Sequence, residues 1–163
     1  MLGTMMDVPM LLSRLIDFAG DHHGRTEVVS RLYGGGFERT NWAALRIRAK
    51  RLAKAMNANG HKVDGVVASL AWNTANHVEL FYGALGIGVA LHTLNPRLNA
   101  DDLRYMTEKV GSTAIFVDYG TLALAEQLAP LVPQVRQWIY MDEAGEPLPQ
   151  SSLPGLIAKS EYV

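Results

Sequence analysis

Cysteine is absent from the 163 residues, which excludes disulfides and thiolate metal sites. This absence is compatible with a reducing compartment, and we therefore expect a cytoplasmic protein. An excess of one charge is also absent, because 15 basic and 16 acidic residues leave a formal net charge of -1. The composition therefore gives no electrostatic reason to expect nucleic acid or an anionic membrane as a partner.

Long hydrophobic runs are missing too. No apolar stretch approaches the ~20 residues that a transmembrane helix needs. Near the N-terminus, Asp7 and Pro9 interrupt the segment that would have to be continuously apolar in a signal peptide. The sequence thus predicts a soluble protein without a transmembrane segment, and its 48% hydrophobic content is enough to bury one sizeable core.

The residue patterns that usually carry catalysis are lacking as well. The sequence shows no P-loop, no metal-ligand spacing, no paired carboxylates and no Ser–His–Asp grouping. His22 and His23 are neighbours whose side chains diverge, which favours a solvated loop over a metal site. The glycines at 34–36 lie between two expected strands and favour a hairpin turn over a phosphate cradle. We therefore predict no catalytic residue and no metal ligand in this chain.

The stretch from Val66 to Leu98 organises what is present. An apolar run from Val66 to Ala71 is typical of a buried strand, and a second run follows at Val89 to Leu91. Between them lies a segment of helical periodicity. Two strands separated by a helix form a βαβ unit, whose strands are parallel and whose crossover is right-handed.

The flanking segments extend this unit. We expect a hairpin over 26–39, a helix from Thr40 or Asn41 to Gly60, a helix from Asn99 to Gly111, a strand from Thr113 to Val117, a helix over 121–129 and a strand over 135–141. The predicted fold class is α/β, with a mostly parallel sheet of four strands, helices on both faces and an N-terminal β-hairpin.

Three helix faces can be assigned from spacing. We expect an apolar stripe of Leu11, Leu12, Leu15, Ile16 and Phe18 after a cap at Asp7, a buried stripe of Val78, Phe81 and Leu85 in the central helix, and a solvated basic face of Arg46, Arg48, Lys50, Arg51 and Lys54 in the long helix. A phosphate-binding patch is the less favoured interpretation of this basic face.

The composition changes at Asp142, where Glu, Pro, Gly and Ser become frequent. We therefore divide the chain into an α/β subdomain over 1–141 and a loop or linker tail over 142–163. Within the tail, Leu153 to Lys159 are expected to form at most a short helix that lacks a packing partner.

Ligands of doubly wound sheets bind beyond the carboxyl ends of the strands. Here those ends are expected at Trp72-Asn73, His92-Thr93 and Asp118-Tyr119. Trp72, Asn73, His92 and Thr93 are therefore the predicted ligand-facing residues. This pattern indicates a location for a ligand but no particular chemistry.

An ordered series of blocks carries a family resemblance: TEVVSRL, then VVASLAWNTANHVELFYGALGIGVALHTLNPRL, then AIFVD. The sharpest piece is the run from Leu91 to Leu98. Together, over about residues 5 to 142, these blocks resemble the N-terminal part of acyl-CoA synthetases of the adenylate-forming superfamily, most of all the medium- and long-chain fatty-acyl branch. One departure is Asp64-Gly65-Val66, where the family usually shows Gly-Asp-Arg.

The resemblance implies an activity for a longer protein. Family members use ATP and Mg²⁺ to convert a carboxylic acid into an acyl-adenylate and pyrophosphate, and then transfer the acyl group to coenzyme A. Their phosphate loop and catalytic lysine lie downstream of any residue in this chain. The resemblance therefore implies an inactive N-terminal fragment that binds no cofactor alone and whose partners are the downstream subdomains, with a fatty acid as substrate of the full-length enzyme.

Two other classes stay open at this stage. The chain could be a stand-alone oligomerisation or interaction module, or an unrelated nucleotide-binding α/β domain. For the fragment itself a homodimer is expected, because a subdomain without its neighbour leaves apolar surface uncovered and the apolar N-terminal arm over residues 1–6 suits packing on a second copy.

Overall fold

A computed structural model describes residues 3–4, 7–141 and 147–163. Its elements are α1 (Arg14–His22), β1 (Glu27–Arg31), β2 (Phe37–Asn41), α2 (Trp42–Ala58), β3 (Val66–Leu70), α3 (Ala75–Gly86), β4 (Ala90–Leu94), α4 (Ala100–Val110), β5 (Ala114–Val117), α5 (Leu122–Leu128), β6 (Gln137–Tyr140), β7 (Ile157–Ala158) and α6 (Lys159–Tyr162). The 3₁₀ turns η1 (Tyr119–Thr121) and η2 (Ala129–Leu131) flank α5.

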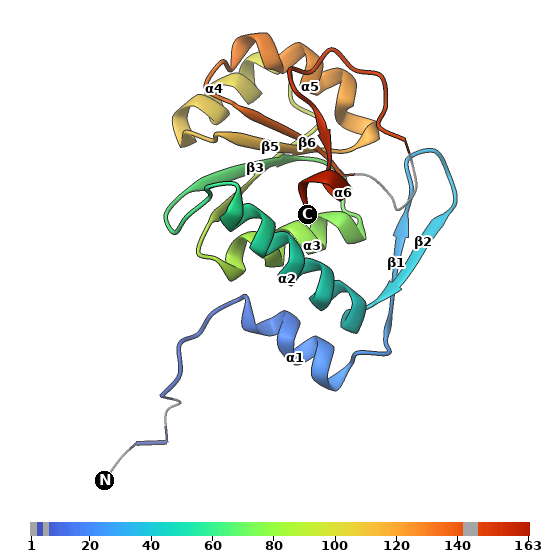
Figure 1. Cartoon of the computed structure of the whole chain (residues 1–163), viewed down its shortest axis with the longest axis vertical. Coiled ribbons are helices and arrows are strands. Elements are labelled where there is room, and N and C mark those ends of the chain that lie inside the picture. Colours follow the sequence, from blue (N-terminus) through green and yellow to red (C-terminus); the bar gives the residue numbers. More distant parts are fainter. Residues whose placement is uncertain (1–2, 5–6, 142–146) are drawn as a thin grey trace.

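The main sheet has the order β4-β3-β5-β6-β7, and all of its neighbouring strands are parallel. A separate antiparallel pair, β1 and β2, forms the hairpin arm beside it (Figure 1). The predicted α/β class, the parallel sheet and the hairpin are therefore confirmed. The sheet has five strands among the described residues, one more than predicted.

Helices cover both faces of the sheet, with α4 and α5 on one side and α2 and α3 on the other (Figure 1). Strand β5 shows why both faces are apolar. Its alternate residues Ile115 and Val117 join the core under α4 and α5, while Ala114 and Phe116 join the core under α2 and α3. A strand covered on both faces must be apolar at every position, as this one is.

Local caps fix the ends of two helices. The Asn41 side chain accepts a hydrogen bond from the Ala44 amide at 2.9 Å, and the Asn99 side chain accepts one from the Asp102 amide at 2.9 Å. Gly111 ends α4 with a φ of 75°, a left-handed conformation that glycine adopts without steric cost. These starts and stops confirm the sequence signals.

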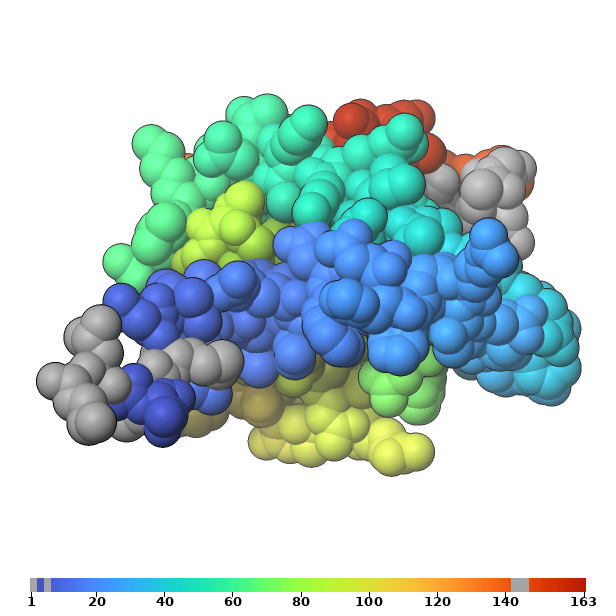
Figure 2. Space-filling view, turned by 90° about the horizontal axis from the view of Figure 1, so that it is seen from below, coloured from blue at the N-terminus to red at the C-terminus, as the bar shows by residue number. Residues whose placement is uncertain are grey.

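The predicted apolar stripe of the first helix is only partly correct. The helix begins at Arg14, and only Ile16 of the stripe is buried, where it joins Leu45 and Ala49 of α2. The other members, Leu11, Leu12, Leu15 and Phe18, are 53–59% exposed. Figure 2 shows α1 in blue as the outermost layer of its face, where it packs mainly on α2. Residues 1, 2, 5 and 6 of the expected arm lie outside the described residues.

The predicted buried stripe of α3 is wrong. Val78, Phe81 and Leu85 are only partly buried, whereas Leu80 and Ala84 are fully buried against the sheet. The helix is covered on a second side by α2, and this contact requires small residues. A Cβ at Gly83 would lie 3.2 Å from the Ala49 carbonyl oxygen.

The end of the chain is also better packed than predicted. Ile157 and Ala158 pair in parallel with Ile139 and Tyr140 as the fifth strand, and the ring of Tyr162 meets that of Phe116 edge-on at 5.8 Å. The expected unpartnered helix is therefore wrong, because the open edge of β6 is the partner. Residues 142–146 of the predicted loop lie outside the described residues, and the division at residue 141 stays a prediction.

Candidate functional site

A cleft of about 950 Å³ lies at the carboxyl ends of the parallel strands. One wall comes from the residues that follow the strands, and the opposite wall is the tip of the hairpin. The lining residues are Trp72, Asn73, Thr74 and Asn76 after β3, Arg97 after β4, Asp118 and Tyr119 after β5, Tyr140 and Met141 at the end of β6, and Arg31 to Gly35 of the hairpin. This size and place are typical of ligand sites in open α/β sheets.

The structure places the predicted ligand-facing residues in two groups. Trp72 and Asn73 line the cleft, as do Asp118 and Tyr119. His92 and Thr93 do not line it, because they lie inside β4, which continues to Leu94. The chain reaches the cleft from β4 only after the turn at Asn95-Pro96, through Arg97.

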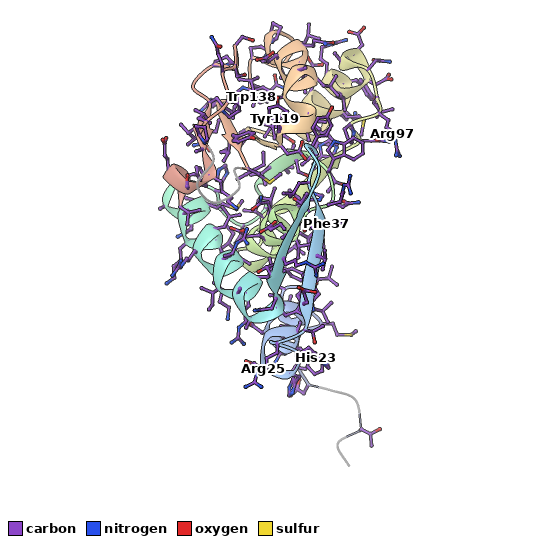
Figure 3. The ribbon with its side chains drawn as sticks, turned by 90° about the vertical axis from the view of Figure 1, so that its right-hand side faces the viewer. His23, Arg25, Phe37, Arg97, Tyr119 and Trp138 are labelled. Atoms are coloured by element: carbon purple, nitrogen blue, oxygen red, sulfur yellow. The ribbon has the colours of Figure 1, made fainter. Side chains whose placement is uncertain are left out.

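Sequence reasoning missed the hairpin as part of the site. The ring of Tyr33, at the hairpin tip, lies 5.9 Å from the ring of Tyr119. Figure 3 shows the hairpin running along the molecule with its tip beside Tyr119. The three glycines at 34–36 indicated a turn, but no local signal shows what a turn will touch.

Two arginines stand at the cleft over aromatic rings. The guanidinium carbon of Arg97 lies 5.8 Å from the centre of the Trp72 ring, and that of Arg31 lies 5.2 Å from the centre of the Phe37 ring. Within the described part of the chain, neither guanidinium makes a salt bridge to a carboxylate. The cleft can therefore attract a ligand that combines anionic groups with a flat ring.

Asp118 joins the ends of β3 and β5. Its carboxylate accepts hydrogen bonds from the Trp72 amide at 2.6 Å and from the Thr121 hydroxyl at 3.0 Å. Burial raises the pKa of Asp118 above its ordinary value, although these hydrogen bonds act in the opposite direction. The carboxylate thus fixes the backbone of Trp72 at the floor of the cleft.

Buried Ser69 and partly buried His77 form a pair behind the cleft wall. The Ser69 hydroxyl and His77 Nε2 are 2.9 Å apart, and His77 Nδ1 lies 3.4 Å from the Asn73 side-chain oxygen. Burial lowers the pKa of His77. Ser69 is only 1% exposed, so its hydroxyl cannot reach a substrate in the cleft. The pair is therefore not placed to act as a hydrolytic dyad on a ligand in the cleft.

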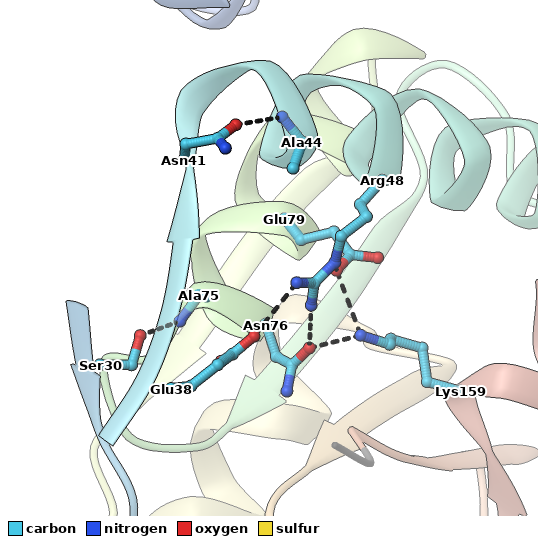
Figure 4. A network of polar contacts seen from close by, with 9 residues as sticks. All are labelled: Ser30, Glu38, Asn41, Ala44, Arg48, Ala75, Asn76, Glu79 and Lys159. Carbon is cyan, nitrogen blue, oxygen red and sulfur yellow. Dashed lines mark hydrogen bonds and ion pairs between the residues drawn. The ribbon is translucent and has the colours of Figure 1, made fainter. Parts of the chain in front are cut away.

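A network of charged and amide side chains backs the same wall (Figure 4). Arg48 donates to Glu79 at 2.9 Å and to Glu38 at 3.1 Å, and Lys159 donates to Glu79 at 3.1 Å. Both cations also donate to the Asn76 side-chain oxygen. The network joins the hairpin, α2, α3 and α6. Because Asn76 lines the cleft, the network holds part of the cleft wall in place.

The basic face of α2 has a structural use that was not predicted. Arg48 points into the network, Arg46 forms an ion pair with Asp21, and Lys50 forms one with Asp17 at 2.5 Å. These pairs leave little of the face for phosphate. The favoured reading of a simple solvated face is therefore wrong for Arg48.

Neither a metal site nor a membrane span is found in the part of the chain that the structure describes. No group of three or more His, Asp and Glu side chains there has metal-binding geometry. No described helix is long and apolar enough to cross a bilayer.

A five-stranded parallel sheet with a cleft at its carboxyl strand ends defines an α/β subdomain of the doubly wound class. The comparison with known families identifies the family to which this subdomain belongs. A family model described as AMP-binding enzyme matches residues 16–156, so the chain belongs to the AMP-binding enzyme family.

Curated relatives agree with this membership. A 3-methylmercaptopropionyl-CoA ligase of Ruegeria pomeroyi is 37% identical over all of this chain and 30% of its own length. A long-chain-fatty-acid–CoA ligase of Thermus thermophilus is 35% identical over 86% of this chain and 26% of its own length. A medium-chain-fatty-acid–CoA ligase of Ectopseudomonas oleovorans is 29% identical over all of this chain and 30% of its own length. The chain thus spans less than a third of these relatives and corresponds to their N-terminal part.

Solved structures show the same fold. The N-terminal domain of FACL13 from Mycobacterium tuberculosis superposes with a TM-score of 0.71 at 21% identity, covering 81% of this chain and 34% of its own. A Mycobacterium tuberculosis fatty acyl CoA synthetase gives a TM-score of 0.63 at 21% identity, covering 80% of this chain and 27% of its own. The resemblance to acyl-CoA synthetases is therefore confirmed, and the fold is that of their N-terminal domains.

Proposed function

We propose that this chain is the N-terminal part of a fatty-acyl-CoA ligase, which activates a carboxylic acid with ATP and Mg²⁺ and then forms the CoA thioester. The observation that carries the proposal is the similarity to acid–CoA ligases over the whole chain, at 37% identity for one relative and 29% for another. The chain alone is inactive under this proposal, because the phosphate loop and catalytic lysine implied by the resemblance have no match in these residues.

The cleft is the part of this chain that faces substrate in the proposed enzyme. The aromatic rings of the cleft suit a purine, and its guanidinium groups, which have no salt bridge to any described carboxylate, suit phosphates. Among the implied substrates, ATP and CoA carry both of these features. The proposal therefore assigns the cleft to the nucleotide portion of one of them, with Arg97 and Trp72 as the first contacts.

Pyrophosphate release tests the proposed inactivity. The purified 163-residue chain is incubated with ATP, Mg²⁺ and carboxylic acids from short to long chain length, with and without CoA. The expected result is no acid-dependent pyrophosphate above a protein-free control. Acid-dependent release by the purified chain would overturn the proposal.

A second candidate function is an interaction module that forms a homodimer. The exposed side chains of Leu15 and Phe18 on α1, and of Leu11 and Leu12 just before it, favour it.

A cytoplasmic location is also part of the proposal, and fractionation of cells that produce the tagged chain tests it.

A further inference from the structure

The hairpin is firmly held below its tip. The Ser30 hydroxyl is buried and accepts a hydrogen bond from the Ala75 amide at 2.8 Å, and Glu38 accepts one from Arg48 at 3.1 Å. These two contacts tie both strands of the arm to α2 and α3. Below the tip, the arm therefore behaves as part of the rigid body.

The hairpin tip, residues 32–36, is held much more loosely. Its backbone bonds are internal, from the Leu32 amide to the Gly36 oxygen at 3.3 Å and from the Gly35 amide to the Leu32 oxygen at 3.2 Å. Gly35 and Gly36 have positive φ angles, and a Cβ at 34, 35 or 36 would meet no atom within 4 Å. The tip is therefore a glycine-rich segment with open space around its glycines, as far as the described residues go.

One side chain of the tip reaches across the cleft. The Tyr33 ring pairs with that of Tyr119 and lies against Gly120. A Cβ at position 120 would lie 2.5 Å from Tyr33 Cδ2 and 2.8 Å from Trp72 Nε1. Because Gly120 has no side chain, the rings of Tyr33 and Trp72 can both approach it closely.

We propose that the hairpin tip is a lid on the strand-end cleft, closed when the Tyr33 ring lies on Gly120 between Tyr119 and Trp72. The lid opens by bending at the glycines while Ser30 and Glu38 hold the rest of the arm. In the closed state it narrows the entrance beside Trp72 and places an aromatic ring over whatever the cleft holds. The inference rests on the proposed role of the cleft as a ligand site, but its test needs no ligand.

The test exploits the absence of cysteine from the chain. A single Gly34→Cys substitution carries a bimane fluorophore, which a nearby tryptophan quenches on contact. Trp72→Phe in the same chain identifies the quenching that comes from the cleft, as distinct from Trp42 and Trp138. We expect quenching in the labelled chain and its loss in the Trp72→Phe variant.

Two further variants open the lid by different routes. Gly120→Ala displaces the Tyr33 ring by steric overlap, and Tyr33→Ala removes it. Each should lower the closed population about fivefold and raise the fluorescence toward the level of the Trp72→Phe chain. Tyr33 is 67% exposed, so Tyr33→Ala leaves the fold intact even if Gly120→Ala disturbs η1.

The possible results distinguish a failure of the lid proposal from a failure of the proposed nucleotide site. Unchanged quenching in Tyr33→Ala would overturn the lid, and so would quenching that does not depend on Trp72. ATP or CoA is added to the labelled chain only afterwards. Increased quenching by either compound supports closure over a nucleotide, whereas no change with an otherwise responsive lid counts against the cleft assignment alone.

Discussion

At the scale of single residues, partly buried histidines couple the stability of the protein to pH. Burial lowers the pKa of His61, His77 and His92 below the ordinary value of 6.5. Their protonation therefore favours the unfolded chain. This penalty is absent above the unfolded pKa and grows as pH falls through it, so the free energy of unfolding should decrease from about pH 7 to about pH 5.5.

A substitution at His77 measures the contribution of this one histidine to the change of unfolding free energy with pH. His77→Gln keeps a polar group near Ser69 but cannot be protonated, so we expect a shallower decline of the unfolding free energy with falling pH. One histidine contributes at most about 1.4 kcal/mol per pH unit. Urea melts across this pH range measure the slope, with His23→Gln on the surface as the matched control. An equal change in both variants would contradict the assignment.

Asp64 is the only described residue other than glycine with a positive φ, at 66°. It occupies the first position of the segment where the related family usually has Gly-Asp-Arg. We expect Asp64→Gly to raise the free energy of unfolding by about 0.5 to 1 kcal/mol, because relief of left-handed strain exceeds the entropy cost of glycine. Chemical denaturation measures it. The neighbouring Gly65→Ala should instead destabilise, since its Cβ would lie 2.9 Å from the Lys62 oxygen.

At the scale of elements, the buried network holds the hairpin, α2, α3 and α6 together. Glu79 is 3% exposed and contacts two cations. Glu79→Gln leaves Arg48 and Lys159 without their shared carboxylate, so we expect a loss of about 3 kcal/mol in unfolding free energy. Adding Lys159→Met should recover part of that loss.

An exposed ion pair supplies the control for this experiment. Arg104 and Glu108 are one helical turn apart on α4, 3.2 Å from each other, and both side chains are more than 40% exposed. Glu108→Gln should cost less than about 0.5 kcal/mol. A Glu79→Gln variant as mild as Glu108→Gln would show that the network contributes little to stability.

The elements that follow local rules could be predicted from the sequence. The Asn41 and Asn99 caps, the glycine turn of the hairpin and the apolar runs of β3 and β5 depend on residues close in the chain. The buried face of α3 could not be predicted, because Glu79 is tolerated inside only through Arg48 and Lys159, which are 31 and 80 positions away. An isolated glutamate in a helix predicts a solvated position.

The candidate site likewise contains residues that could be predicted from the sequence and residues that could not. The strand-end residues Trp72 and Asn73 follow from the parallel topology, so the sequence located one wall of the cleft. The contribution of Tyr33 depends on where a hairpin arm comes to rest and on the missing side chain at Gly120. The position of β7 likewise depends on pairing with β6 across a gap in sequence. Contacts of this kind carry no periodic signal.

At the scale of the whole molecule, the uncovered face of α1 predicts self-association. Soluble monomers rarely expose contiguous apolar patches of this kind, and a symmetric dimer is the commonest way to cover one. We expect the chain to sediment as a dimer at micromolar concentration, and the double substitution Leu15→Ser and Phe18→Ser to shift it toward monomer. Val110→Ser on α4 serves as the control. A monomer unaffected by either variant would refute the proposal.

We propose that this chain can serve as the N-terminal part of an acyl-CoA ligase, and a chimeric enzyme tests this proposal most directly. The segment of the Ruegeria pomeroyi ligase that aligns with this chain is replaced by residues 1–163. The account predicts acid-dependent pyrophosphate release and CoA thioester formation by the chimera, and neither by the ligase with that segment deleted. A chimera that folds as well as the parent ligase yet shows no activity with ATP, its acid and CoA would contradict the account.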